Sequence, residues 1–244
     1  MILIICAAGR GSRIRKTFKD PKCLIKFNKS SIIQNILNIF NVKKIKKIII
    51  IVGYKKEKII KKIGYKFSNK KIIYIDNKNY KTTNNMYSLF LTKRYIDRGV
   101  VFVASDLYLE KNIKYSFDKL KVKNFILVDK NKSFFKNADL TKILIENHKI
   151  KELGKTEYKG KVNAVAPGMY GMSKNLFNEF IKISENFIKD KKYRYGYNEV
   201  IKALIKKRYN FFEFYPKNYL WRNINKSTDI DYVKNQLKKK RINI

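Results

Sequence analysis

The first seven residues, Met1–Ala7 (MILIICA), form an unbroken apolar run that leads directly into the glycine-rich segment GRGSR. A strand with apolar side chains on both faces needs cover on both sides, as the strands of parallel sheets have. Similar runs alternate with helical patterns: we expect strands at 47–52, 71–75 and 100–104, and helices at 31–40, 54–63 and 84–96. This alternation predicts an α/β layered fold with a mixed, mainly parallel central sheet.

The second half of the chain has shorter strand patterns. We expect strands at 125–129, 141–146, 149–153, 162–172 and 211–215, helices at 174–189 and 197–207, and a basic helix from about 228. Asn147-His148 is expected to join two of these strands as a hairpin turn. Because no linker composition separates the halves, the sequence predicts a single domain over 1–244, whose later strands form a smaller β lobe.

The composition bounds the class of protein. An apolar content of 45% in 244 residues supports a folded core, and two cysteines provide no disulfide framework, which indicates a reducing compartment. No apolar stretch approaches the roughly 18 residues of a membrane span, and no signal-peptide cleavage site follows the short apolar start. We therefore expect a cytoplasmic protein that has no membrane partner.

The formal net charge of +38 raises the question of nucleic acid as a partner. The lysines, however, are spread over nearly every segment, and isoleucine and asparagine, which share A/T-rich codons with lysine, are equally overused. We expect no specific nucleic-acid partner, and a basic nucleic-acid-binding protein stays as an alternative.

The segment after the first apolar run is suited to binding phosphate. In open α/β sheets, ligands bind at the carboxyl ends of the strands, where this segment begins. Small residues let backbone N–H groups approach a ligand closely, and the segment has five of them: Ala7, Ala8, Gly9, Gly11 and Ser12. Arg13 and Lys22 add positive charge. The spacing is neither the GxxxxGK[ST] of a P-loop nor the GxGxxG of a dinucleotide-binding motif.

Motifs in order along almost the whole chain resemble those of one family. CAAGRGSRI…PKCLI is similar to the AAGxGxR…PK signature of nucleotidyltransferases, which transfer a nucleoside monophosphate from an NTP to a phosphorylated acceptor. NNMYSLFL (84–91) resembles a helix of the phosphocholine and inositol-phosphate cytidylyltransferase branch. The other matching stretches are IIVGY (50–54), VASDLYL (103–109), ADLTKILIENHKIKELGK (138–155) and LWRNINKSTDI (220–230).

The resemblance implies a Rossmann-like fold, with a mainly nucleotide-binding half at 1–110 and a mainly acceptor-binding half at 111–244. It implies Mg²⁺ as cofactor, with Asp106 as a ligand, and Asn225 stands where the family has a second carboxylate. Nucleotide contacts fall on the loop residues above and on Gly53, Asn85, Tyr87 and Ser88. Acceptor contacts fall on Lys142, Lys155, Arg194 and Glu199.

Several of these residues also have ordinary structural interpretations. Asp106 follows a strand and can cap a helix, whereas a carboxylate at that edge can also hold Mg²⁺. Asn85 can be a cap, Tyr87 a core residue, and Glu199 a solvated helix charge. Trp221 is expected to be a core anchor. The only histidine, His148, is expected in an exposed turn, which argues against histidine-based catalysis.

One departure from the branch concerns the acceptor. The acidic residue that helps to hold the quaternary ammonium in phosphocholine enzymes falls on Tyr197, which disfavours choline, and the nearby Arg194 suggests an anionic group instead. The oligomeric state is left open.

The sequence thus predicts a Mg²⁺-dependent transfer of CMP from CTP to a phosphorylated small molecule, with release of pyrophosphate, for surface polysaccharide or lipid head-group precursors. A phosphate monoester is largely dianionic at pH 7, so it can attack without a general base. The alternatives are a sugar-1-phosphate uridylyl- or guanylyltransferase and a metal-dependent glycosyltransferase.

Overall fold

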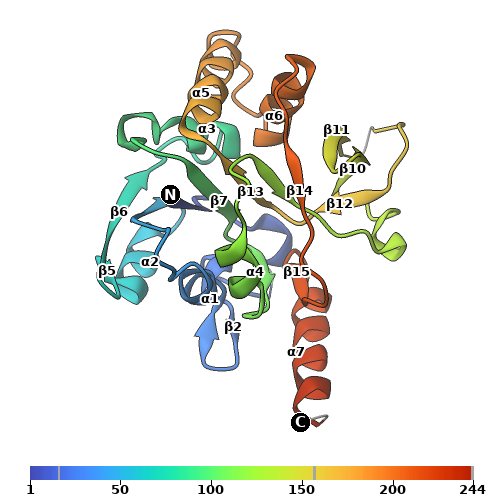
Figure 1. The fold of residues 1–244 in the computed structure, drawn as a ribbon. Coiled ribbons are helices and arrows are strands. Elements are labelled where there is room, and N and C mark those ends of the chain that lie inside the picture. Colours follow the sequence, from blue (N-terminus) through green and yellow to red (C-terminus); the bar gives the residue numbers. More distant parts are fainter. Residues whose placement is uncertain (16, 156–157, 243–244) are drawn as a thin grey trace.

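The computed structural model describes residues 1–15, 17–155 and 158–242 (Figure 1). Four adjacent parallel strands of its main sheet follow in the order β6, β4, β1, β7. Their bounds are β1 Ile2–Ala7, β4 Lys47–Val52, β6 Lys70–Asp76 and β7 Val100–Ala104. A short antiparallel strand, β5 (Lys66–Phe67), lies at the edge. The expected parallel strands are confirmed, and their carboxyl ends meet at one edge of the sheet.

The strands of the second half continue the same sheet. β13 (Met169–Met172) runs antiparallel between β7 and β9 (Phe125–Leu127), and β14 (Phe212–Phe214) follows beside β9. The sheet ends with β11 (Lys149–Gly154), β10 (Thr141–Glu146) and β12 (Ala164–Ala166). Only the pair Lys149–Phe212 joins β11 to β14 among the described residues, and one bridge, Asp129–Val165, reinforces this junction.

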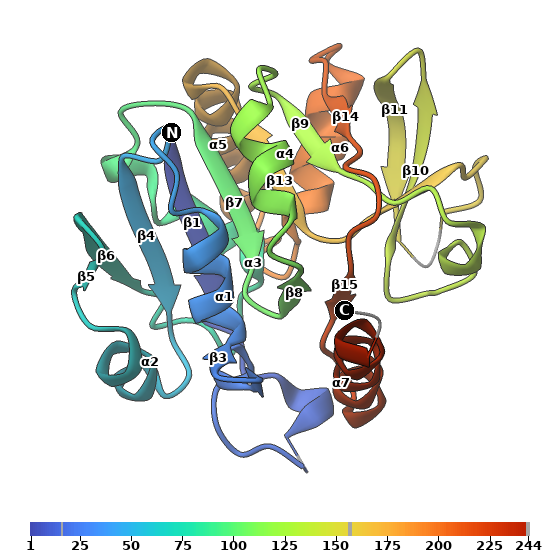
Figure 2. The ribbon, with the colours of Figure 1, turned by 60° about the horizontal axis from the view of Figure 1, so that its bottom comes forward.

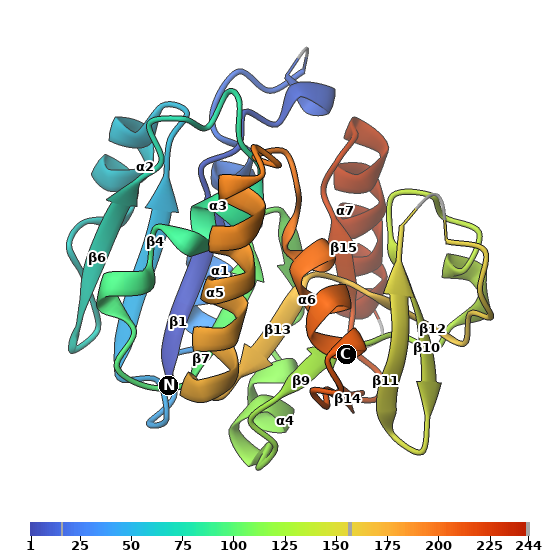
Figure 3. The ribbon, with the colours of Figure 1, turned by 90° about the horizontal axis from the view of Figure 1, so that it is seen from above.

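Helices cover both faces of the sheet (Figures 2 and 3). On one face, α1 (Ile32–Ile39), α2 (Lys56–Ile63) and α4 (Ile113–Lys119) share an apolar core with inward residues of β1 and β4. On the other face lie α3 (Asn85–Phe90), α5 (Lys174–Lys189) and α6 (Tyr197–Lys206). The apolar run in β1 is therefore buried from both sides.

Two small sheets complete the fold. β2 (Lys26–Phe27) and β3 (Ser30–Ser31) form a hairpin before α1, whose N-terminus is closed by a capping box between Ser31 and Gln34. β8 (Leu107–Leu109), which follows β7, pairs with β15 (Trp221–Asn223), and α7 (Ser227–Ile242) comes next. The β8–β15 register places Asn223 opposite Leu107, and the Ile224 N–H donates to the Asp106 carbonyl at 2.9 Å.

The structure adds to the expected elements and shortens some. α4, β8, β15 and the small hairpin were not expected, and the helix expected at 84–96 ends as α3 at Phe90, with a short 3₁₀ turn at Lys93–Tyr95. The run 162–172 divides into β12 and β13 at Gly168, whose φ of 119° belongs to the left-handed region. Trp221 is buried, as expected for a core anchor, and its Nε1 donates to Asp129 at 2.6 Å. No helix in the described part of the chain is long and apolar enough to cross a membrane.

Gly171 on β13 offers a test of core packing. A Cβ atom placed there would overlap the ring of buried Phe125 on the neighbouring strand. We expect Gly171→Ala to lower the free energy of unfolding by about 1–3 kcal/mol, since overpacking forces neighbours from their rotamers. Urea unfolding measures this, with Gly9→Ala as the control, because no atom lies within 4 Å of a Cβ at Gly9. Equal urea unfolding midpoints for wild type and Gly171→Ala would contradict the tight packing of Gly171 against Phe125.

Candidate active site

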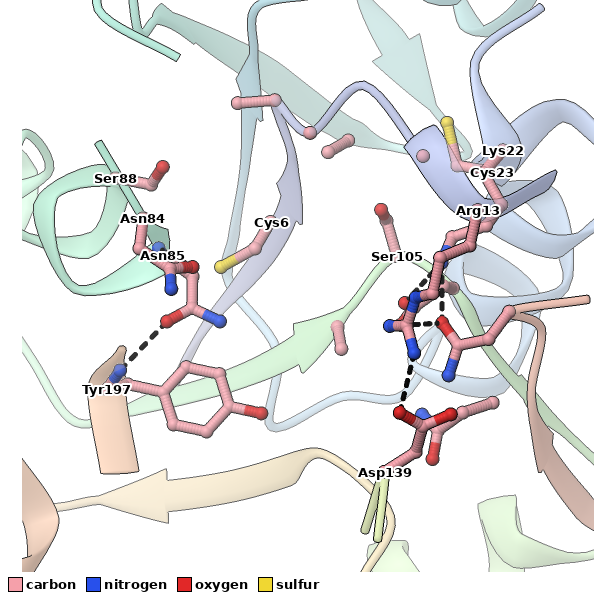
Figure 4. Close-up of a pocket in the computed structure, with 18 of the residues that line it drawn as sticks. Cys6, Arg13, Lys22, Cys23, Asn84, Asn85, Ser88, Ser105, Asp139 and Tyr197 are labelled. Atoms are coloured by element: carbon pink, nitrogen blue, oxygen red, sulfur yellow. Dashed lines mark hydrogen bonds and ion pairs between the residues drawn. The ribbon is translucent and has the colours of Figure 1, made fainter. Parts of the chain in front are cut away.

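A cavity of about 410 Å³ opens at the carboxyl edge of the parallel strands (Figure 4). The ends of β1, β6 and β7 line one part of it, and the start of β10, the β12–β13 turn and the start of α6 line the other. Its polar and charged lining includes Arg13, Lys22, Asn77, Asn84, Asn85, Ser88, Ser105, Asp106, Asp139, Thr141, Lys155, Tyr197, Asn223 and Asn225.

The glycine-rich loop forms the upper wall beside β1. Gly11 has a φ of 61°, and a Cβ on it would lie 3.3 Å from the Lys22 Cβ. Within the described residues, no hydrogen bond occupies the backbone N–H groups of Gly9, Arg10 and Gly11. Gly9 and Gly11 line the cavity, so their N–H groups are available to a bound anion.

Gly53 lies close to the backbone of this loop. A Cβ at Gly53 would come within 2.9 Å of the Ala8 carbonyl oxygen and 3.0 Å of Tyr80, and the Tyr54 N–H donates to the same oxygen at 3.1 Å. The close approach of these two loops explains glycine at position 53. Gly53 does not line the cavity, so its expected contact with the nucleotide stays a prediction.

The Lys22 ammonium joins two oxygen ligands at the centre of the site. Its Nζ donates to Asp106 Oδ2 at 2.7 Å and to Asn225 Oδ1 at 3.0 Å. Only 14% of the Lys22 side chain is exposed, so this contact is better shielded than a surface ion pair. The structure therefore brings together Lys22, Asp106 and Asn225, which lie 84 to 203 residues apart in the chain.

Asp229 fixes the position of Asn225. One oxygen of its buried carboxylate accepts the N–H groups of Asn225 at 2.8 Å and of Lys226 at 2.9 Å, and the other accepts Arg222 Nε at 2.8 Å. With the β8–β15 pairing, this network holds the end of β15 beside the end of β7.

The Arg13 guanidinium lies across the cavity. Its Nη1 donates to Asp139 Oδ1 at 2.6 Å and its Nη2 to Asn225 Oδ1 at 3.1 Å. Asp139 lies just before β10, so this pair connects the glycine-rich loop to the strands of the second half (Figure 4). The pair is half-exposed, at 54% for Arg13 and 41% for Asp139.

The oxygen atoms of Asp106 and Asn225 fit a hard divalent cation such as Mg²⁺, because both converge on one position that Lys22 Nζ occupies. The described residues contain no group of three or more His, Cys, Asp or Glu side chains that could hold a metal. A metal here would therefore take its other ligands from water and from a bound phosphate.

Amide side chains at the other end of the cavity connect the helices. The buried Asn77 donates to Ser88 Oγ at 3.0 Å and to Thr83 at 3.1 Å. Asn85 Oδ1 accepts the Tyr197 N–H at the start of α6, at 2.8 Å. Asn85 and Ser88 thus line the cavity and also hold neighbouring segments together. Tyr87 and the exposed Ser12 are not among the residues that line the cavity.

The residues expected to contact the acceptor do not all lie at the cavity. Lys155 lines the cavity, but Lys142 alternates with the cavity-lining Thr141 along β10 and takes the opposite face. Arg194 and Glu199 are exposed outside this cavity, and Glu199 lines a neighbouring groove instead. The roles of these four residues stay predictions.

Tyr197 and the half-buried Cys6 line the cavity, and the buried Tyr170 packs against the Tyr197 ring. Burial raises the pKa of Tyr197 and of Tyr170 well above the usual range, and it raises the pKa of Cys6 to about 12. The cavity therefore has a thiol at Cys6, not a thiolate nucleophile, at pH 7.

Sequence reasoning missed Asp139, Asp229 and Asn77. Each is an Asp or Asn next to a strand end or a helix start, where such residues commonly serve as turns and caps. For Asn77 and Asp139 the available signal was their place directly after or before an expected strand, whereas Asp229 lies within the expected C-terminal helix and gave no such signal.

No family model matches the chain. By sequence, it is 37% identical over 114 residues to a choline-phosphate cytidylyltransferase of Streptococcus pneumoniae, covering 46% of this chain and 48% of that protein. It is 28% identical over 102 residues to a 2-aminoethylphosphonate cytidylyltransferase of Lancefieldella rimae, covering 41% and 40%. The chain thus matches less than half the length of these relatives.

By fold, the chain is similar to the inositol-1-phosphate CTP transferase from T. maritima, with a TM-score of 0.75 and 19% identity over 93% of this chain and 90% of that one. The Rossmann-like fold expected from the motifs is thereby confirmed. The relatives and the structural neighbour are nucleotidyltransferases, which confirms the resemblance to this family and to its phosphocholine and inositol-phosphate branch.

Proposed function

We propose that the protein is a nucleotidyltransferase that transfers CMP from CTP to a phosphorylated small molecule. The observation that carries this proposal is the convergence of Lys22 Nζ, Asp106 and Asn225 beneath a loop with unpaired N–H groups. Such a site provides cations and N–H donors for a triphosphate and oxygen ligands for its metal. The cytidylyltransferase relatives support CTP as the donor.

The reaction joins an oxygen of the acceptor phosphate to the α-phosphorus and breaks the bond from that phosphorus to the β-phosphate oxygen, so pyrophosphate leaves. Arg13 and Lys22 offset the negative charge that develops on the phosphates. The loop N–H groups orient the nucleotide, and Lys155 holds the acceptor phosphate from the other side. Because the acceptor phosphate is already an anion, positioning and charge neutralisation suffice.

Mg²⁺, the metal that we propose, would be held by Asp106 and Asn225 and would neutralise phosphate charge when bound. Lys22 must then exchange its present partners for phosphate oxygens. We propose that the reaction takes place in the cytoplasm. Its CDP-linked product would serve as a precursor for surface polysaccharide or lipid head groups.

The reaction is tested by measuring pyrophosphate release for four NTPs against phosphorylated alcohols, amino acids and sugars. We expect release with CTP and Mg²⁺, and a loss of at least about 10²-fold in Asp106→Ala, because the triphosphate loses a metal ligand. Asp118→Ala, which removes an exposed carboxylate on α4, is the control. The proposal is contradicted if none of the four NTPs gives pyrophosphate release. It is also contradicted if Asp106→Ala keeps a tenth of the wild-type activity while its circular dichroism spectrum shows that it is folded.

Lys22→Met separates catalysis from metal binding. Removing the ammonium should lower kcat by about 10²-fold, yet tighten Mn²⁺ binding to the nucleotide-free protein by about tenfold or more, since a competing cation leaves the oxygen ligands. Electron paramagnetic resonance of free Mn²⁺ measures the binding. The exposed Lys26→Met on β2 should behave as wild type. If Lys22→Met binds Mn²⁺ no better than wild type, Lys22 does not compete for the metal ligands.

Asn225 gives the site one negative charge fewer than two carboxylates would. Asn225→Asp should therefore lower the Mg²⁺ concentration for half-maximal activity, and Asn225→Ala should raise it. A Mg²⁺ titration at saturating CTP measures both, with Asn38→Asp, at an exposed position of α1, as a charge-matched control. Identical Mg²⁺ dependence in wild type and both variants would remove Asn225 from the metal site.

A further inference from the structure

A second and larger cavity lies beside the candidate active site. It is a groove of about 1020 Å³ between β11 and α6, which pack against each other (Figure 3). Lys155 lines both cavities, so they meet at the side chain that is proposed to hold the acceptor phosphate. The lining of the groove has five lysines: Lys151, Lys155, Lys159, Lys202 and Lys206. The proposed reaction uses only the second of them.

Two carboxylates also line the groove, and both have other surroundings that stabilise them. The Tyr158 hydroxyl donates to Glu152 Oε2 at 2.8 Å. A Cβ on Gly154 would lie 2.8 Å from the Tyr158 Cβ, so this tyrosine packs closely over the end of β11. Glu199 lies in the first turn of α6, where the helix dipole stabilises a negative charge. Neither carboxylate forms an ion pair with a groove lysine in the described part of the chain.

The groove lysines are therefore positive charges without compensating partners. Elsewhere on the surface, Lys56 and Lys240 form ion pairs with carboxylates. Among the described residues, the five groove lysines form none. Like charges that line a concave surface repel each other and raise the local concentration of anions. A bound anion would offset this repulsion, so the groove suits an anionic partner.

The lysines also follow a path that leads away from the candidate active site. α6 begins at Tyr197, which lines the active-site cavity. A rise of about 1.5 Å per residue places Lys202 roughly 7–8 Å and Lys206 roughly 13–14 Å further along the helix axis. On the other wall, an extended backbone separates Lys151 from Lys155 by up to about 13 Å. Both walls thus offer cations at increasing distance from the proposed position of the acceptor phosphate.

We propose that the groove binds a second phosphate of the acceptor, separated from the reacting phosphate by an extended spacer. The inference rests on the proposed function and names its substrate class, an extended chain with more than one phosphate. The reacting phosphate lies at Lys155, and the remote phosphate lies between Lys151 and the lysines of α6. These remote lysines bind the acceptor and take no part in making or breaking bonds.

Calorimetry of acceptor binding tests the proposal without turnover. The probes are hexane-1,6-diol bisphosphate and hexane-1,6-diol monophosphate, each titrated into protein that is saturated with α,β-methylene-CTP and Mg²⁺. We expect the bisphosphate to bind at least about tenfold more tightly, which one charge-assisted hydrogen bond to the remote phosphate can supply. The bisphosphate and monophosphate of ethane-1,2-diol should differ only by the statistical factor of about two, because the second phosphate stays beside the active-site cavity.

Two matched double variants locate the effect. Lys202→Gln/Lys206→Gln removes two exposed ammonium groups one helical turn apart on α6. It should reduce the preference for the hexane bisphosphate to the statistical factor while it still binds the analogue. Lys234→Gln/Lys238→Gln removes two exposed lysines with the same spacing from α7 and should keep the wild-type preference. Because both variants lose the same net charge, a general attraction of anions to a basic protein would affect them equally.

Equal binding of the two hexane probes by the analogue-loaded wild type would overturn the inference. So would an equally large preference in the ethane pair, a preference that persists in Lys202→Gln/Lys206→Gln, or an equal loss in Lys234→Gln/Lys238→Gln. Binding of neither hexane probe, when the pyrophosphate assay shows turnover with other acceptors, would also overturn it. If that assay shows no turnover with any NTP and acceptor, the proposed function itself fails. The two failures are therefore distinguishable.

Discussion

The contact of one ammonium group with two oxygen atoms organises the candidate site. Lys22 Nζ joins the end of β7, through Asp106, to the end of β15, through Asn225. The pairing of β8 with β15 and the hydrogen bond from the Asn225 backbone to Asp229 hold these segments together. The geometry at the centre of the cavity thus depends on the packing of the C-terminal segment against the parallel sheet, as much as on the glycine-rich loop.

The sequence was most informative where structure is determined locally. The apolar runs of β1, β4 and β7 predict strands because parallel strands buried on two faces require them, and Asp106 follows from its place after such a run. The loop residues and Lys22 follow from the small and basic residues after the first strand and from the resemblance of the motif, whereas the contact of Lys22 with Asp106 and Asn225 is seen only in the structure. Gly53 is expected from the motif to contact the nucleotide, which stays a prediction, and the structure explains glycine there by its close approach to Ala8.

The parts that sequence could not provide depend on contacts between distant segments. β8 and β15 have three residues each, too few for a periodic pattern, and they exist because they pair with each other. Asp139 resembles a turn residue until the fold places it 2.6 Å from Arg13. Similarly, side chains alternate between the two faces of β10, so Lys142 points away from the cavity. A motif match cannot reveal this, because it does not say which face of the strand lies toward the cavity.

The junction between β11 and β14 has a consequence for how the two sides of the cavity respond to mutation. The side of the cavity built on β1 belongs to ladders of five or six residue pairs on each side of that strand. Strand pairing joins β10–β12 to the rest of the sheet by one ladder pair and one bridge, within the residues that the structure describes. Few main-chain hydrogen bonds therefore resist a small change of tilt there. Substitutions that reshape the β10–β12 side of the cavity should therefore place little strain on the ladders beside β1.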